Sequence, residues 1–258
     1  MNELIILSLA ALGTSLLTFF SGFGLGTILM PVFAIFFPVD LAIALTGVVH
    51  FLNNLFKLSL IGWKADRQTA IRFGIPAFLA AIAGAYVLIQ ASDLEPFYEY
   101  AIGDKVYSIT PVKLIIAVLL IFFALMEVMP SFKSLQFGKD KLIVGGLLSG
   151  FFGGLSGHQG ALRSAFLIKS KLSKEAFIAT GIVIACIVDI SRLGVYYTRF
   201  SHGMLKENLT LILAATLSAF AGAYLGNRLL KKVTMRTVQL IVTVMLVALS
   251  LALGVGIV

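Results

Sequence analysis

The sequence has few of the residues on which most enzymes, metal sites and disulfide-stabilised domains depend. It contains one cysteine, Cys186, which lies in an apolar run, so disulfides and cysteine-based metal sites are excluded. Aspartate and glutamate together number 12 in 258 residues and form no cluster that could hold a metal ion. Zinc-protease, nucleophile-elbow and P-loop motifs are missing as well. We therefore expect no enzyme activity, no cofactor, no bound metal and no ATP-driven pumping.

Apolar residues make up most of the chain. Hydrophobic residues account for 59% and charged residues for 12%, and the mean hydropathy is +1.02. Several apolar runs reach about 20 residues, the length of a helix that crosses the hydrocarbon core of a membrane. The N-terminal "MNELIILSLAALG" lacks the basic region of a cleavable signal peptide. These features predict an all-α integral membrane protein. In such a protein the net charge of +8 indicates cytoplasmic loops, not nucleic-acid binding.

The apolar runs predict about eight transmembrane segments, and the first and fifth of these are interrupted by glycine. The two interruptions lie in "FFSGFGLGTILMP" (19–31) and "FFGGLSGHQGALR" (151–163). The longest polar connection, 91–107, is acidic. The predicted helices are 4–20, 24–36, 40–62, 68–90, 108–129, 141–155, 158–169, 174–197, 207–228 and 234–256.

The two halves of the chain resemble each other. "AIAGAYVL" (81–88) matches "AFAGAYLG" (219–226), and "AIALTGVV" (42–49) matches "AFIATGIV" (176–183) less closely. The glycine-rich breaks precede these stretches by similar distances. We therefore predict a duplication, with one transmembrane repeat in 1–130 and a second in 131–258. Internal repeats are a common plan for secondary transporters.

The distribution of charge predicts that the two repeats are inverted. Basic residues around 65 and 231 favour a cytoplasmic position for both loops, whereas the acidic loop 91–107 is expected outside. The repeat pairs the loop near 231 with the acidic loop, so equivalent loops lie on opposite sides. This topology requires each broken segment to be a hairpin that leaves the membrane on the side where it entered. Arg199 and Lys206 fit it less well, because their loop would lie outside.

The glycine-rich breaks are the predicted ligand-binding segments. Backbone outside a helix is tolerated at membrane depth only where it is buried in protein or lines a wet cavity. Each break precedes a half-helix, whose N-terminal N–H groups and dipole favour an anion. The alternative is that the glycines only allow helices to pack closely. The predicted contacts are Ser21, Gly22, Gly24, Gly26, Thr27, Ser156, Gly157, His158 and Gln159.

A polar helix face adds candidate ligands. His50, Asn54 and Lys57 are spaced i, i+4, i+7 and therefore share one face. Asp189 and Arg192 occupy the equivalent positions in the second half. Ionisable residues inside a span usually face a cavity or a partner, so Lys57 and Arg192 are candidate anion ligands. Two alternatives remain open: Arg192 pairs with Asp189 at i, i+3, or Lys57 extends toward the cytoplasmic interface.

Titratable residues in the same regions are candidates for coupling protons to transport. These candidates are His158, His50 and Asp189, because a histidine can change charge near neutral pH. The alternative is a neutral histidine held by its neighbours. Arg163, at the start of a half-helix, is a candidate contact for substrate or lipid head groups. Tyr196 is predicted to lie in an interfacial aromatic belt.

The order of these motifs resembles the sulfite exporter TauE/SafE family of membrane permeases. The resemblance rests on "SGFGLGTILMP", "ALTGVVHFLNNLFKLSLIGWKAD" and "IPAFLAAIAGAYVL" in the first half. In the second half it rests on "GGLLSGFFGGLSGHQGALRSAFLI" and "FIATGIVIACIVDISRLGVYY". It implies a secondary transporter of sulfur-containing anions in the bacterial or archaeal cytoplasmic membrane. It also implies that substrate lies between the breaks and the polar faces. His158 and Gln159 depart from a plain glycine cluster.

The predicted function is secondary active transport of sulfite, sulfoacetate, another organosulfonate or sulfate by alternating access. The predicted partners are a small anionic substrate, the lipid bilayer and H⁺ as coupling ion, without nucleic acid. A homodimer is compatible with the sequence, but no motif requires one. Two other classes remain open. An anion channel would lack trans-stimulation, and a membrane scaffold or accessory subunit would bind no small anion.

Overall fold

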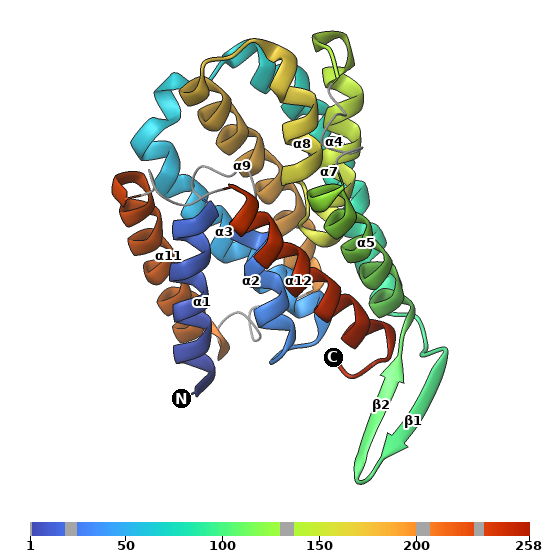
Figure 1. Ribbon diagram of the computed structural model, residues 1–258. Helices are drawn as coiled ribbons and strands as arrows, with labels where there is room; N and C mark the ends of the chain where they lie inside the picture. Colours follow the sequence, from blue (N-terminus) through green and yellow to red (C-terminus); the bar gives the residue numbers. More distant parts are fainter. Residues whose placement is uncertain (1, 19–24, 130–136, 200–206, 230–234) are drawn as a thin grey trace.

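The computed structural model describes residues 2–18, 25–129, 137–199, 207–229 and 235–258, and these form a bundle of helices with one projecting β-hairpin (Figure 1). Every predicted helix is present, with ends that differ from the prediction by no more than three residues. The helices are α1 (Asn2–Thr18), α2 (Leu25–Ala34), α3 (Val39–Ile61), α4 (Arg67–Ser92), α5 (Pro111–Val128), α7 (Leu142–Ser156), α8 (Gly160–Leu167), α9 (Lys174–Arg199), α11 (Leu209–Leu229) and α12 (Met235–Gly254). Short 3₁₀ turns follow α3 (Gly62–Lys64), precede α7 (Lys139–Lys141) and follow α8 (Ile168–Ser170).

Four stretches of the described chain are long and apolar enough to cross a membrane. They are Val39–Lys64, Arg67–Ser92, Lys174–Arg199 and Leu209–Gly226. Shorter apolar helices accompany them at Asn2–Thr18, Leu25–Ala34, Pro111–Met126 and Thr243–Gly254. The main apolar core joins both halves of the chain, since Leu7, Phe33 and Leu45 belong to the same cluster as Leu246. This is the architecture of an all-α membrane protein.

Two helical hairpins enter the bundle from opposite ends. α1 starts at the end that holds the N-terminus and α2 returns to it, whereas α7 and α8 make the same excursion from the other end (Figure 1). The second hairpin turns at Gly157, which has φ +80° and ends α7 by donating its N–H to the Gly153 carbonyl at 3.0 Å. The first break, 19–24 between α1 and α2, lies outside the described residues.

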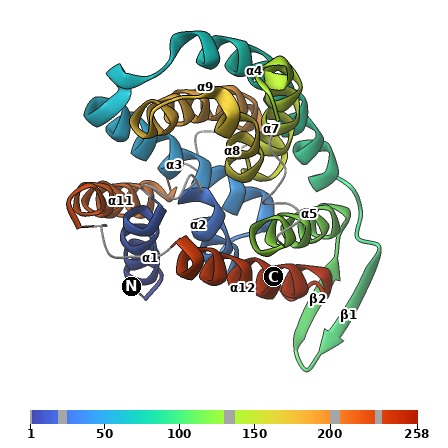
Figure 2. The same cartoon turned by 45° about the horizontal axis from the view of Figure 1, so that its top comes forward.

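Each hairpin packs against a long helix from the other half of the chain. α7 packs on α4, and α1 packs on α11 (Figure 2). A Cβ atom on Gly84 of α4 would lie 2.0 Å from the Phe151 carbonyl oxygen of α7. A Cβ atom on Gly222 of α11 would lie 2.2 Å from the Leu12 carbonyl oxygen of α1. Gly84 and Gly222 are the glycines of the two "AGAY" stretches, so matching residues allow matching close approaches.

The connection 91–107 is more ordered than the sequence analysis implied. It contains β1 (Tyr98–Ile102), which pairs antiparallel with β2 (Lys105–Ile109). Gly103 has φ +61° at the first position of the two-residue turn, a conformation that suits glycine in hairpins. The sequence analysis described this connection only as polar and acidic and did not predict its two strands. The alternation of Tyr98, Tyr100 and Ile102 on one face was the signal for a strand.

The two ends of the bundle differ in charge. The end where α3 and α8 finish and α4, α7 and α9 begin is opposite the end with both termini and the β-hairpin (Figure 1). Exposed basic residues mark the elements at the first end. They are Lys64, Arg67, Arg72, Lys139, Lys141, Lys169, Lys171 and Lys174. We call this the basic end.

Candidate functional site

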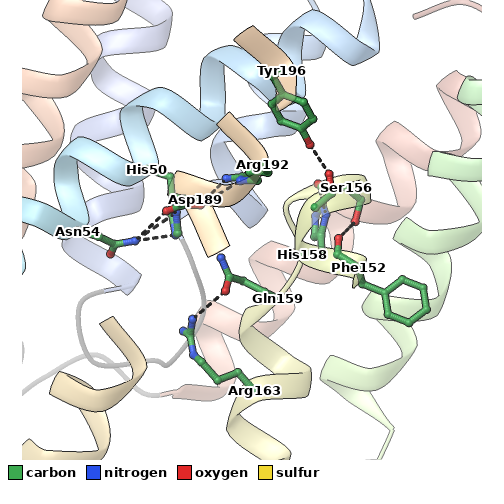
Figure 3. Close-up of polar contacts among 11 residues, drawn as sticks. His50, Asn54, Phe152, Ser156, His158, Gln159, Arg163, Asp189, Arg192 and Tyr196 are labelled. Atoms are coloured by element: carbon green, nitrogen blue, oxygen red, sulfur yellow. Dashed lines mark hydrogen bonds and ion pairs between the residues drawn. The ribbon is translucent and has the colours of Figure 1, made fainter. Parts of the chain in front are cut away.

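The buried charged and histidine side chains of the described residues gather between α3, α8, α9 and the second break, and Figure 3 labels all of them except Lys57. The most exposed of them, Arg163, is 8% exposed. They are His50 and Lys57 on α3, His158 in the break, Arg163 on α8, and Asp189 and Arg192 on α9. Charged groups are rarely buried in apolar surroundings unless they are paired, so their contacts indicate what the cluster can do.

Asp189 lies at the centre of this cluster. Its Oδ1 accepts hydrogen bonds from Arg192, at 3.0 Å from Nε and 2.8 Å from a terminal guanidinium nitrogen. Its Oδ2 lies 2.6 Å from Nδ1 of His50. The Asn54 amide nitrogen lies 3.2 Å from the same His50 nitrogen and 3.5 Å from Asp189 Oδ2. The i, i+3 pairing of Asp189 with Arg192, one of the two open alternatives, is therefore present.

The Arg192 guanidinium lies next to two glycines, Gly47 and Gly157. A Cβ atom on Gly47 of α3 would lie 3.3 Å from Arg192 Cζ. A Cβ atom on Gly157 would lie 3.0 Å from a guanidinium nitrogen. The absence of a side chain at both positions thus leaves room for the guanidinium. Gly157 also has a positive φ, which favours glycine for a second reason. This contact brings the second break against the polar faces of α3 and α9.

A cavity of about 40 Å³, with room for a few water molecules, lies next to the cluster. Its polar wall includes His50, Asn54 and Lys57 from α3 and Arg163 from α8. Thr18 and Leu25, the facing ends of α1 and α2, also line it. The remaining lining residues are Ser164, Leu167, Phe177, Ile178, Gly181, Ile182 and Ala185. Since α8 ends and α9 begins among these residues, the cavity extends toward the basic end.

The cluster carries more positive than negative charge. Lys57, Arg163 and Arg192 are three cations, and Asp189 is the single buried carboxylate among the described residues. With neutral histidines the balance is therefore +2. The Arg163 guanidinium has a long contact, 3.4 Å, with the Gln159 side-chain oxygen. A buried surplus of charge is costly in low-dielectric surroundings, so an anion in the cavity would be stabilised.

The second break is fixed mainly by its own hydrogen bonds. Ser156 donates its hydroxyl to the Phe152 carbonyl at 3.0 Å, and His158 Nδ1 lies 2.9 Å from the Ser156 carbonyl oxygen. The His158 ring also stacks on Phe123, with centroids 5.5 Å apart. Nε2 of His158 and the side-chain nitrogen of Gln159 are buried without a hydrogen-bond partner in the described part of the chain. Neither residue lines the cavity.

The first turn of α2 approaches the second break. A Cβ atom on Gly26 would lie 3.9 Å from the Gly157 carbonyl oxygen and 3.9 Å from Cδ2 of His50. Thr27, next to Gly26, is buried. The first turn of α2 therefore lies against the second break and the polar face of α3.

Comparison with protein families matches residues 7–253 to the family described as sulfite exporter TauE/SafE. The chain belongs to this family. No curated protein and no solved structure matches the chain. Family membership and the apolar helices together make it a multi-pass membrane protein of a family of membrane transporters for sulfite-like anions.

In this TauE/SafE protein, the predicted site residues fall into three groups. Lys57, Asn54 and His50 line the cavity. The second group is described but does not line the cavity: Gly26, Thr27, Ser156, Gly157, His158, Gln159, Asp189 and Arg192. The third group, Ser21, Gly22 and Gly24, lies outside the described residues.

Arg163 and Tyr196 differ from their expected roles. Arg163 was considered for substrate or head groups, and its burial beside the cavity favours the first. The position of Arg163 in the first turn after the break was the sequence feature that could have placed it in the candidate site. Tyr196 is 2% exposed and donates its hydroxyl to the Gly154 carbonyl, so its assignment to an interfacial belt was wrong. It lies one turn after Arg192 on the same helix face, which the aromatic pattern alone did not reveal.

Proposed function

We propose that this protein is a secondary active transporter of a small sulfur-containing anion across the cytoplasmic membrane. Sulfite, sulfoacetate, another organosulfonate and sulfate are the candidate substrates. The observation that carries the proposal is the surplus positive charge beside the cavity, where Lys57 and Arg163 belong to its wall. Arg163 can donate two parallel hydrogen bonds to an oxyanion, and Lys57 adds a compact second charge.

Alternating access would follow from two inverted repeats, 1–130 and 131–258, in a chain of about eight transmembrane segments. The opposed hairpins and the matching contacts of Gly84 and Gly222 support this arrangement. The basic end is assigned to the cytoplasm, because basic residues are concentrated in cytoplasmic loops. The cavity then opens toward the cytoplasm, and exchanging the conformations of the two repeats would open it outward.

Transport is proposed to be coupled to protons, with His50 and Asp189 as the coupling pair. His50 lines the cavity and contacts Asp189, so it connects the substrate space with the buried carboxylate. His158 is a weaker candidate, since its ring stacks on Phe123 away from the cavity. Replacing His158 by glutamine should therefore leave the pH dependence of transport unchanged.

The proposal is tested by anion binding to the purified protein and by transport in liposomes. A thermal-shift screen would use sulfite, sulfate, thiosulfate, sulfoacetate, taurine, phosphate and chloride, because a ligand that binds the folded state raises its thermal midpoint. Loss of a hydrogen bond to a charged group costs about 1.5–3 kcal/mol, so Lys57→Gln or Arg163→Gln should weaken binding about 10- to 100-fold. Arg72→Gln, an exposed cation on α4, is the matched control.

Transport then separates a carrier from a channel. A carrier exchanges labelled for unlabelled anion faster than it moves label alone, whereas an open pore shows no such stimulation. Unchanged affinity in both cavity variants would exclude Lys57 and Arg163 as ligands. A wild-type protein that bound none of the anions would contradict the proposed function as a whole.

A further inference from the structure

The contact between His50 and Asp189 joins the two helices that carry the polar faces. His50 lies on α3 and Asp189 on α9, and their 2.6 Å contact links residues 139 positions apart. Asp189 uses its other oxygen for Arg192 on its own helix. One carboxylate therefore serves both as counter-ion to a guanidinium and as partner to an imidazole. Each oxygen has a separate role.

These residues differ in their access to the cavity. His50 and Asn54 line it, whereas Asp189 and Arg192 lie behind them. A proton that arrives through the cavity therefore reaches His50 before it reaches the carboxylate. The direct contact between His50 Nδ1 and Asp189 Oδ2 lets the two groups share that proton.

The other charged and titratable groups near Asp189 are cations or weak acids. α4 and α7 also pack on α9, but neither places a titratable group near Asp189. α7 contains no titratable residue, and Arg67, Arg72 and Tyr86 of α4 lie toward the ends of that helix. The groups around the cluster are His50 and Lys57 on α3, Arg163 on α8, Cys186, Arg192 and Tyr196 on α9, and His158 in the break. Asp189 is thus the one described carboxylate that can balance Arg192.

We propose that Asp189 is a built-in counter-anion that competes with the transported anion for Arg192. When the His50–Asp189 pair takes up one proton, its charge changes from −1 to 0 and the cluster charge from +2 to +3. Arg192, flanked by Gly47 and Gly157, then attracts an external anion in place of the carboxylate. Loss of the proton restores the internal pair and favours release. This inference rests on the proposed function and adds Arg192 as the group through which the His50–Asp189 pair would couple proton to anion.

The inference predicts that anion affinity falls as pH rises. Binding of the proton and of the anion must strengthen each other by the same factor, because coupling between two sites is reciprocal. For one coupled proton, the dissociation constant changes by up to about tenfold per pH unit. Asn at position 189 has no charge to lose, so Asp189→Asn should bind the anion tightly at every pH.

The experiment compares dissociation constants for sulfite and for sulfate between pH 5 and 8, by isothermal titration of the detergent-purified protein. The ionisation of each ligand is the same for all variants, so the ratio of wild-type to variant constants reports the protein alone. For Asp189→Asn this ratio should be near one at the acidic limit and rise by up to about tenfold per pH unit above it. Asp66→Asn, a carboxylate outside the cluster, should keep the ratio constant.

Several outcomes would overturn the inference. One is a constant ratio for Asp189→Asn, even if the variant unfolds at a lower temperature, because that result describes a purely structural ion pair. If Asp189→Asn does not fold, the same titrations are made with Arg192→Gln and with the double variant Asp189→Asn/Arg192→Gln. Both variants should bind the anion weakly, and the part of their dissociation constant that depends on the protein should not change with pH. Wild-type affinity with wild-type pH dependence in Arg192→Gln would contradict the inference. The proposed function fails separately, if wild type binds neither anion at any pH.

Discussion

α3 and α9 are paired by the proposed repeat, yet the cations at their matching positions have different surroundings. Lys57 follows the neutral Asn54 by three residues and lines the cavity. Arg192 follows Asp189 by three residues and is bound to it, behind the cavity wall. Both cations are about equally buried. The comparison teaches that the residue one turn earlier, an amide or a carboxylate, decides whether a buried cation is neutralised within its own helix.

The same two halves are alike where backbone meets backbone. Gly84 and Gly222 each allow a long helix to approach a hairpin of the other half. The two halves therefore share the close helix contacts at matching glycines, whereas the charges at the matching positions of α3 and α9 differ. An inverted-repeat transporter needs equivalent packing to exchange two conformations, but its ligand site can be asymmetric.

The largest expected effect comes from filling these two close contacts. Gly84→Leu and Gly222→Leu should each prevent the folded state and so exceed the about 1–3 kcal/mol that overpacking usually costs, because the new side chain would meet backbone that cannot move away independently. We expect loss of the monodisperse peak in size-exclusion chromatography for both. Gly194→Leu is the control, since nothing lies within 4 Å of a Cβ atom at Gly194. Tolerance of only one of the two substitutions would argue against equivalent packing.

The next largest effect should distinguish the matching polar positions. Asp189→Ala leaves Arg192 buried beside a histidine without its carboxylate, which costs about 3–5 kcal/mol. Asn54→Ala removes only long contacts and should cost about 1 kcal/mol. The measurement is the midpoint of thermal unfolding at one detergent concentration. Asp189→Ala combined with Arg192→Met should recover much of the loss, and a double variant no more stable than Asp189→Ala would contradict the ion-pair explanation.

The smallest effect concerns two helix N-termini at the basic end. Asp66 accepts a hydrogen bond from the Thr69 N–H at 2.8 Å at the start of α4, and Ser173 accepts one from the Ala176 N–H at 3.2 Å at the start of α9. Replacing either by alanine should cost about 1 kcal/mol at neutral pH. The two helix caps should differ in how the stability that each contributes depends on pH.

Hydrogen bonds from Thr69 lower the pKa of Asp66 below its ordinary value. The stabilisation by Asp66 is therefore complete above the ordinary pKa of about 3.9 and is lost as pH falls through the lower pKa of the folded protein. The effect of Asp66→Ala on the thermal midpoint should shrink below pH 4, whereas that of Ser173→Ala should not. Equal shrinkage for both variants would show that the carboxylate is not responsible.

Much of the fold could be predicted because it depends on local properties of the chain. Apolar length located the helices of the described residues, and a glycine cluster located the interruption between α7 and α8. Basic residues grouped the loops that lie together at the basic end. The β-hairpin was missed because its charges suggested a solvated loop, although the alternation of Tyr98, Tyr100 and Ile102 indicated a strand.

The sequence by itself determined the class of protein, its helices and the candidate residues His50, Asn54, Lys57, Asp189 and Arg192, since helical spacing places them on two faces. Only the tertiary structure decided that Asp189 contacts His50 across 139 residues, that Arg163 joins Lys57 at the cavity, and that Tyr196 is buried. The physical reason is that spacing along a helix fixes which side chains share a face. The packing of α3, α8 and α9 fixes which faces meet.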